Sequence, residues 1–258
     1  MIFRWLRNRR RRKILAGPFP DDWIKILKGN VWQYASLSNP EQAKLRDDLR
    51  LFIAEKHWEG CGGFDLTDEV RVTIAAYACL LGLGLDPDSY GHVMTILVYP
   101  EDYFAPERTY ADGGLVRDEL NNRAGEAWMR GPVILSWADV LSSGRDRGRG
   151  GNLVIHEFAH QLDMLNHEVD GTPPLRDGAR IPEWREVMAN EYDEFVRRVE
   201  RGRRMLLDPY GATNIGEFFA VVTECFFEMP VRLQHDEPLL YAMFREYYGQ
   251  DPAAWLSV

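Results

Sequence analysis

Residues 152–164, NLVIHEFAHQLDM, constrain the fold more than any other stretch, because they set charged groups into an apolar helix. His156 and His160 are four residues apart, so in a helix both imidazoles project from one face, one turn apart. Burying them and the intervening Glu157 among leucine, isoleucine and phenylalanine is costly unless these groups have a partner. A metal ion is such a partner. The segment therefore predicts a buried metal-binding helix of the H-E-x-x-H type.

The H-E-x-x-H pattern is typical of zinc hydrolases, and the chemistry explains the spacing. Zn²⁺ held by three protein ligands keeps a fourth position for water and lowers the pKa of that water to about 7. A carboxylate about 100° round the helix from the first histidine can then take the proton. The pattern predicts His156 and His160 as zinc ligands and Glu157 as the general base. Two buried histidines without a metal are the alternative.

The third ligand does not come from the residues that follow the motif. Metzincins continue with a glycine and a third histidine, but Asp163 and Asn166 stand at these two positions. His167 lies seven residues past His160, about 10 Å along a helix, and is too far away for the same ion.

A second apolar segment, residues 213–230 (TNIGEFFAVVTECFFEMP), supplies acidic candidates instead. Glu217 lies in the predicted first turn after Gly216, where close approach to a metal is sterically easy. Glu224 lies seven residues later, about 10 Å along the axis, and can order a ligand or bond a neighbouring helix instead. Spacing favours Glu217 as the third ligand and leaves Glu224 open.

The rest of the pattern predicts one mostly helical α+β domain. Apolar residues at helical spacing follow residues that commonly start helices. Two short runs rich in β-branched residues predict strands. The second of these strands is a candidate edge along which a peptide could pair. We expect a basic flexible segment over 1–13 and a single domain over 14–258. Helices are predicted to start near Asp22, after Asn39 as the cap with Pro40 at the first helical position, after Thr67, after residue 151, near Pro182, after Thr213 or Asn214, and at Pro238. The predicted strands are 92–100 and 131–137, and 142–151 is a predicted loop.

Charge and cysteine content narrow the function classes. The chain carries a net charge of −9, and residues 1–13 hold seven basic residues and no acid. The remainder has 24 basic and 40 acidic residues, so its charge of about −16 disfavours specific nucleic-acid binding. Three scattered cysteines fit a reducing compartment rather than a disulfide framework. No run is apolar enough for a signal peptide or a membrane span, and a cytoplasmic location is expected.

Five segments, in this order along the chain, resemble the Mlc titration factor A family of bacterial cytosolic zinc peptidases. They are EGCGGFDLTDEVRVTIAAYACLLGLG, ILVYP, GPVILSW, NLVIHEFAHQLDM and YGATNIGEFFAVVTECFF. The likeness runs from about Ile14 to the C-terminus. The site segments are also similar to the catalytic domain of anthrax lethal factor. The resemblance implies a zincin-like domain that binds one Zn²⁺.

The resemblance also implies roles for further residues. Glu217 becomes the third zinc ligand, and Tyr210 becomes the phenol that stabilises the oxyanion. Lethal factor has a glutamate four residues after its ligand glutamate, whereas this chain has Val221. The outer partner of a ligand histidine must then come from elsewhere, and Asp163 and Glu224 are the candidates.

Two functions of different classes follow from these features. The first is a zinc peptidase, which the resemblance places among aminopeptidase-type enzymes acting on peptides. The resemblance further implies binding of a transcriptional repressor of the Mlc type, which affects sugar uptake. The alternative is a non-catalytic regulator-binding protein that retains a structural zinc. Glu157 favours the enzyme, because a structural site has no need of a base.

Overall fold

The chain folds into an α+β structure that is mostly helical, with one small sheet, as predicted. The computed structural model describes residues 2–101, 131–145, 150–203 and 205–256. The helices are α1 (Ile2–Leu15), α2 (Asp21–Asn30), α3 (Gln33–Ser36), α4 (Asn39–Glu55), α5 (Asp68–Gly82), α7 (Trp137–Arg145), α8 (Leu153–Asp163), α9 (Ile181–Glu200), α10 (Ile215–Glu228), α11 (Pro230–Asp236) and α12 (Pro238–Tyr248), with 3₁₀ turns η1 (Met164–Asn166), η2 (Gly178–Arg180), η3 (Pro209–Ala212) and η4 (Ala254–Leu256).

The sheet consists of three parallel strands, β1 (His57–Gly60), β2 (Thr95–Tyr99) and β3 (Val133–Ser136), in the order β1-β2-β3. The strands β2 and β3 confirm the two predicted ones. β1 was not predicted, because its four residues read as the end of the preceding helix. Among the residues that the structure describes, β3 lies at an edge of the sheet, so peptide pairing along it stays a prediction.

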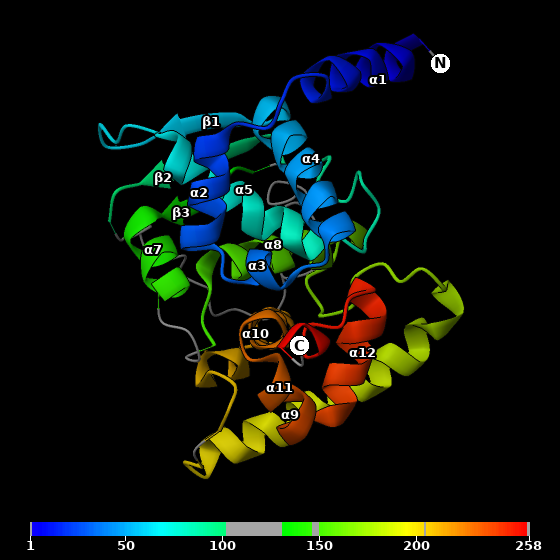
Figure 1. Ribbon diagram of the computed structural model, residues 1–258. Helices are drawn as coiled ribbons and strands as arrows, with labels where there is room; N and C mark the ends of the chain where they lie inside the picture. The colour runs from blue at the N-terminus through cyan, green and yellow to red at the C-terminus, as the bar shows by residue number, and fades with distance from the viewer. Residues whose placement is uncertain (1, 102–130, 146–149, 204, 257–258) are drawn as a thin grey trace, which may run out of the picture.

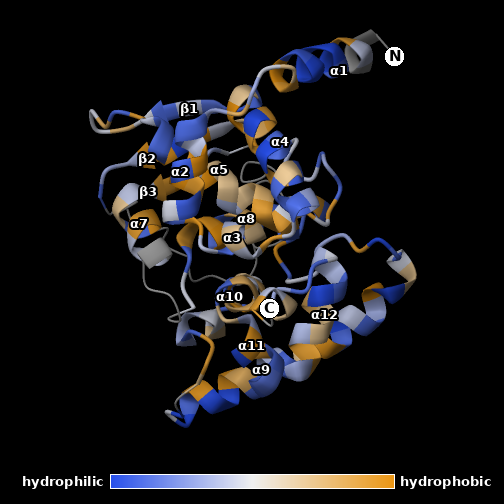
Figure 2. Cartoon of the chain, viewed as in Figure 1, coloured by the Kyte–Doolittle hydropathy of each residue, from blue (hydrophilic) through white to orange (hydrophobic). Residues whose placement is uncertain are grey.

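The core lies where the N-terminal and C-terminal halves of the chain meet. Figure 1 shows the sheet, α2 to α5 and α8 in the upper part of the molecule, and α9 to α12 in the lower part. α10 packs against α8, and α8 packs against α5. Every residue of α5 from Val72 to Leu81 is buried. Hydrophobic residues gather on α5, α8 and α10 in Figure 2.

The start signals of the helices agree with the predictions in most cases. Thr67 caps α5 by accepting the backbone N–H of Val70, and Asn214 caps α10. Asn39 is the first residue of α4 rather than its cap, because Ser38 occupies the extended cap position. Trp137 to Arg145 form α7 where a strand end and a loop were expected.

The basic N-terminal segment is helical in the structure, whereas a flexible segment was expected. α1 extends from the body at the upper right of Figure 1 and is largely hydrophilic in Figure 2. Arg11 pairs with Glu55 at 2.7 Å, and Arg7 pairs with Asp88 at 2.7 Å. Acidic side chains of the body thus meet the arginines of one helix face. A domain boundary near residue 14 stays a prediction.

None of the helices in the described part of the chain is long and apolar enough to cross a membrane.

Candidate metal centre

The motif helix α8 presents its two histidines toward α10. Asn152 starts the helix by accepting the backbone N–H of Ile155 at 3.1 Å. Val154, Ile155, Phe158 and Leu162 are fully buried and fix the helix against the core. The two imidazoles lie one turn apart, as the spacing predicts, with ring centroids 4.8 Å from each other.

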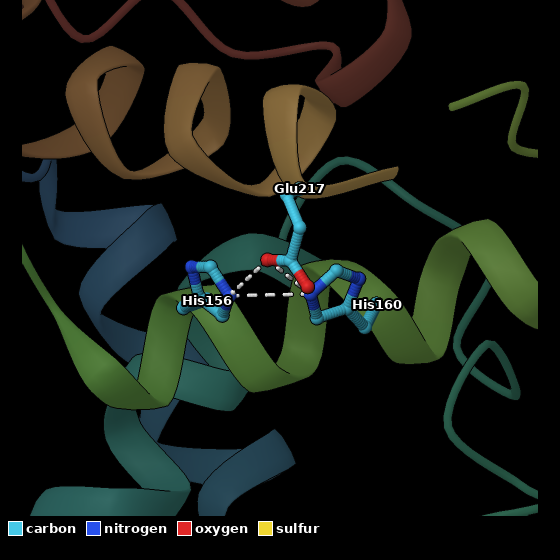
Figure 3. Close-up of side chains that lie close together, drawn as sticks. All are labelled: His156, His160 and Glu217. Carbon is cyan, nitrogen blue, oxygen red and sulfur yellow. Dashed lines mark hydrogen bonds and ion pairs between the residues drawn. The ribbon is translucent and has the colours of Figure 1, made fainter. Parts of the chain in front are cut away.

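α10 brings a carboxylate to the same point, as Figure 3 shows. Asn214 caps the helix by accepting the backbone N–H of Glu217 at 3.0 Å, so Glu217 lies in the first turn. Its Oε2 lies 3.0 Å from Nε2 of His156 and 3.3 Å from Nε2 of His160. The two Nε2 atoms are 3.2 Å apart. The structure thus brings together the three side chains that the sequence selected.

These distances fit a tetrahedral metal site. Two ligands bound at 2.0–2.1 Å to a tetrahedral Zn²⁺ lie about 3.3–3.4 Å apart, close to the three separations seen here. Two imidazole nitrogens and a carboxylate oxygen are also the donor atoms that zinc takes in hydrolase sites. His156, His160 and Glu217 form the group of described residues able to hold a metal ion.

The charges at this site are set by the same contacts. Burial lowers the pKa of His156, but hydrogen bonds with Glu217 and Glu224 outweigh burial and raise it to about 10. Burial raises the pKa of Glu217, but hydrogen bonds from the two histidines lower it to about 2. Both carboxylates therefore favour the protonated form of His156. Metal binding must displace that proton.

Glu224 contacts the first histidine from the side of the ring opposite to Glu217. Its Oε1 lies 2.7 Å from Nδ1 of His156, on the ring side opposite Glu217. Its Oε2 accepts the backbone N–H of Asn152. Such a carboxylate fixes the ring orientation and raises the basicity of the ligand nitrogen.

The hydrogen bonds around His156 and Glu224 continue one helical turn further along α10, to Glu228. This buried carboxylate accepts hydrogen bonds from the Asn152 amide at 2.8 Å, from the Trp32 indole at 2.9 Å and from the Gln33 amide at 3.1 Å. Asn152 therefore links Glu224 to Glu228 while it caps α8. The motif helix and the N-terminal residues 32 and 33 are joined through one polar network.

Asp163, the other candidate for an outer partner, is completely buried at the end of α8. Its Oδ2 accepts the backbone N–H of Gly171 at 2.9 Å and so ties the following loop to the helix. Its Oδ1 and the Nδ1 of His160 are both buried without a hydrogen-bond partner within the described residues. Burial raises the pKa of Asp163 to about 7. A role for Asp163 beside His160 stays a prediction.

The candidate metal centre opens into a cavity of about 680 Å³. Glu157 lines this cavity next to His156, as expected for a group that acts on a bound water. Tyr210 projects from η3 across the cavity, with 55% of its surface exposed and its ring centroid 6.0 Å from that of His156. The structure thus places both predicted catalytic side chains at the metal centre.

Replacing Asn152 tests the polar network independently of any activity. Asn152→Ala removes the cap of α8 and one donor to the buried Glu228 carboxylate, so we expect a loss of about 2–3 kcal/mol in the free energy of unfolding. Urea denaturation of the metal-free protein measures this loss. Asn152→Ser keeps a capping oxygen and should recover about 1 kcal/mol. A loss below about 1 kcal/mol in the alanine variant would contradict the linking role of Asn152.

Sequence reasoning missed Asn152 and Asp208, and it noted Glu228 only as one of three acidic residues of the second apolar segment, without a role. The sequence does carry a signal for Asn152 and for Glu228. An asparagine directly precedes the apolar motif helix, and Glu228 lies four residues from Glu224 in an apolar helix. Asp208 carried none, because its position beside the cavity depends on how η3 packs onto α10.

Comparisons with known proteins agree with this geometry. A family model described as glucose-regulated metallo-peptidase M90 matches residues 5–249. The protein slr2042 of Synechocystis is 41% identical over 249 residues, which cover 96% of this chain and 90% of that protein. Mlc titration factor A of Salmonella agona is 33% identical over 226 residues, covering 86% of this chain and 84% of its own. Mlc titration factor A of Yersinia pestis (strain Pestoides F) is 32% identical over 260 residues, covering 98% and 91%.

Proposed function

The chain belongs to the glucose-regulated metallopeptidase family M90, and from this premise we propose that it is a zinc-dependent peptidase of the aminopeptidase type. His156, His160 and Glu217 are the proposed zinc ligands. The observation that carries the proposal is the set of three mutual distances, 3.0, 3.2 and 3.3 Å, among one oxygen and two nitrogen atoms from two helices. The open cavity beside them leaves room for a peptide.

The proposed mechanism uses the side chains around this centre. When bound, Zn²⁺ polarises the scissile carbonyl and makes a water acidic. Glu157 takes the proton of the attacking water and returns it to the departing amine. Tyr210 donates a hydrogen bond to the carbonyl oxygen as negative charge develops there. Glu224 keeps the His156 ring in orientation through its Nδ1. The Asp163 carboxylate acts on His160 through its charge and holds the loop that follows α8.

Glu157→Gln tests the proposal directly. We expect peptide turnover to fall by about 100- to 10,000-fold, because a general base is lost, while the zinc content per chain stays the same. Metal analysis and an assay on a panel of unblocked peptides measure the two effects. Glu186→Gln, the same substitution at an exposed glutamate of α9, is the matched control. Bound zinc with no turnover in the unsubstituted protein would instead support the non-catalytic alternative with a structural zinc.

We propose in addition that the chain binds a transcriptional repressor of the Mlc type in the cytoplasm. Curated relatives with matches over 84% and 91% of their length carry the name Mlc titration factor A. Co-purification of the full chain with a purified Mlc-type repressor tests the interaction. Repressor binding that persists in Glu157→Gln would separate this function from peptide hydrolysis, and no binding at micromolar concentrations would contradict it.

A further inference from the structure

A smaller cavity of about 150 Å³ adjoins the cavity of the metal centre. The two cavities share four lining residues: Gly151, Asp208, Tyr210 and Glu224. The remaining side chains that line the smaller cavity are apolar or weakly polar: Leu206, Leu207, Val221 and Cys225. A cavity of about this volume lined by apolar side chains holds a benzene molecule. An aliphatic or aromatic side chain of leucine or phenylalanine size therefore fits.

Val221 explains part of this apolar character. At this position of α10, where the sequence departs from the acidic pattern of lethal factor, a side chain of low polarity faces the smaller cavity. An acidic substrate side chain would lose its hydration there without a cationic partner among the described lining residues, which makes its entry costly.

Asp208 lines both cavities, and only one of its two carboxylate oxygens accepts a hydrogen bond within the described residues. Its Oδ1 accepts the backbone N–H of Tyr210 at 2.9 Å, and its other oxygen has no hydrogen-bond partner among the residues that the structure describes. The second shared carboxylate, Glu224, is different, because both of its oxygens are engaged, with His156 and Asn152. No lysine or arginine is among the described residues lining either cavity.

On the basis of the proposed peptidase function, we propose that these features form the subsite for the first residue of a peptide. The smaller cavity takes the apolar side chain of that residue, and the Asp208 carboxylate binds its α-ammonium group. Both groups are attached to the Cα atom next to the first carbonyl. Two anchors beside the metal centre therefore place that carbonyl near Glu157 and Tyr210. The substrate class is peptides with a free amino terminus and a leucine- or phenylalanine-like first residue.

Binding to the zinc-loaded Glu157→Gln protein tests the α-ammonium contact without any turnover. Isothermal titration compares Leu-Gly-Gly with its N-acetylated form. We expect acetylation to weaken binding by about 10- to 100-fold, the range for a hydrogen bond to a charged group. Adding Asp208→Asn should reduce this difference to less than about 3-fold. Asparagine keeps an oxygen for the Tyr210 N–H, so the η3 turn is retained.

Two substitutions of Val221 with opposite effects test the cavity. Val221→Phe fills it and should lower the ratio of affinities for Leu-Gly-Gly over Gly-Gly-Gly by about 10-fold, the order expected for losing one or two buried methylenes. Val221→Ala enlarges the cavity and should shift preference from leucine toward phenylalanine. Val231→Phe, at a half-exposed valine of α11 outside both cavities, is the matched control and should leave both ratios unchanged.

The outcomes separate this proposal from the peptidase proposal. Equal binding of blocked and unblocked peptides, or tight binding of N-acetyl-Lys-Gly-Gly, would overturn the role of Asp208 toward an α-ammonium group. Unchanged ratios in both Val221 variants would overturn the side-chain cavity. Turnover of unblocked peptides by the unsubstituted protein is measured in parallel. Its absence together with the expected binding pattern would overturn the peptidase function and leave the subsite supported.

Discussion

Glu217→Ala is expected to abolish stoichiometric zinc binding and to bring peptide turnover to background. The substitution removes one of the three proposed ligands, and the two imidazoles that remain come from a single helix, so the ion loses its only contact with α10. The loss should exceed the roughly 10- to 100-fold that removal of an outer hydrogen-bond partner costs in metal affinity. The loss of zinc affinity is measured as the zinc content per chain after dialysis against buffer, and by competition against a chelator.

Glu224→Gln is the comparison for this experiment, since it changes a carboxylate of the same helix that contacts the same histidine. It should lower zinc affinity by about 10- to 100-fold, because the outer partner of His156 is weakened while all three ligands remain. Loss of zinc in Glu224→Gln with retention in Glu217→Ala would show that the assignment of the third ligand is wrong. Zinc should also raise the unfolding temperature of the unsubstituted protein but not that of Glu217→Ala, because only the former binds the ion tightly.

Phe226→Ala is expected to cause the largest loss of stability away from the metal centre. Phe226 is fully buried in α10, and its ring lies 5.2 Å from that of Tyr241, 5.6 Å from that of Tyr248 and 6.2 Å from that of Phe244. Truncation leaves a cavity and costs about 3–5 kcal/mol of the free energy of unfolding. Globular proteins have only about 5–15 kcal/mol in total, so much of the stability is lost.

Urea denaturation of the metal-free protein measures the effect of Phe226→Ala without a contribution from zinc. Leu239→Ala is the control, because Leu239 lies on α12 with half of its surface exposed. It should cost less than about 1 kcal/mol. A similar small loss in Phe226→Ala would show that this aromatic cluster does not hold α10 and α12 together.

The group of candidate metal ligands could be predicted because short stretches of sequence determine where these side chains lie on their helices. The i, i+4 spacing of two histidines places them on a common helix face. Thr213 and Asn214 before an apolar segment predict that α10 starts there, so that Glu217 lies in its first turn. Spacing favoured Glu217 as the third ligand but did not exclude Glu224, because both lie on one helix face. In the structure the two residues lie at different points along the axis of α10. The Glu217 carboxylate lies near the Nε2 atoms of both histidines, and the Glu224 carboxylate lies near Nδ1 of His156.

The missed elements depend on contacts between distant segments. β1 has four residues and no pattern of its own, and it exists because β2, nearly 40 residues later, aligns with its backbone. The helical order of α1 depends on pairs such as Arg11 with Glu55, 44 residues away. Asp208 became a candidate only once η3 was placed over α10. Such pairings leave no periodic trace in a single sequence.

The polar network beneath the metal centre has a consequence for how the protein is made. The two histidines are synthesised before Glu217, and Glu228, which Trp32 and Asn152 both contact, is synthesised later still. A nascent chain that has not yet emerged from the ribosome beyond residue 228 therefore carries the histidine pair without its acidic partners. On the proposed ligand set, a metal ion can be held by all three side chains only after α10 has been synthesised and has packed against α8. If the proposed ligands are right, shortened forms that end before α10 lack Glu217 and should bind zinc no better than Glu217→Ala.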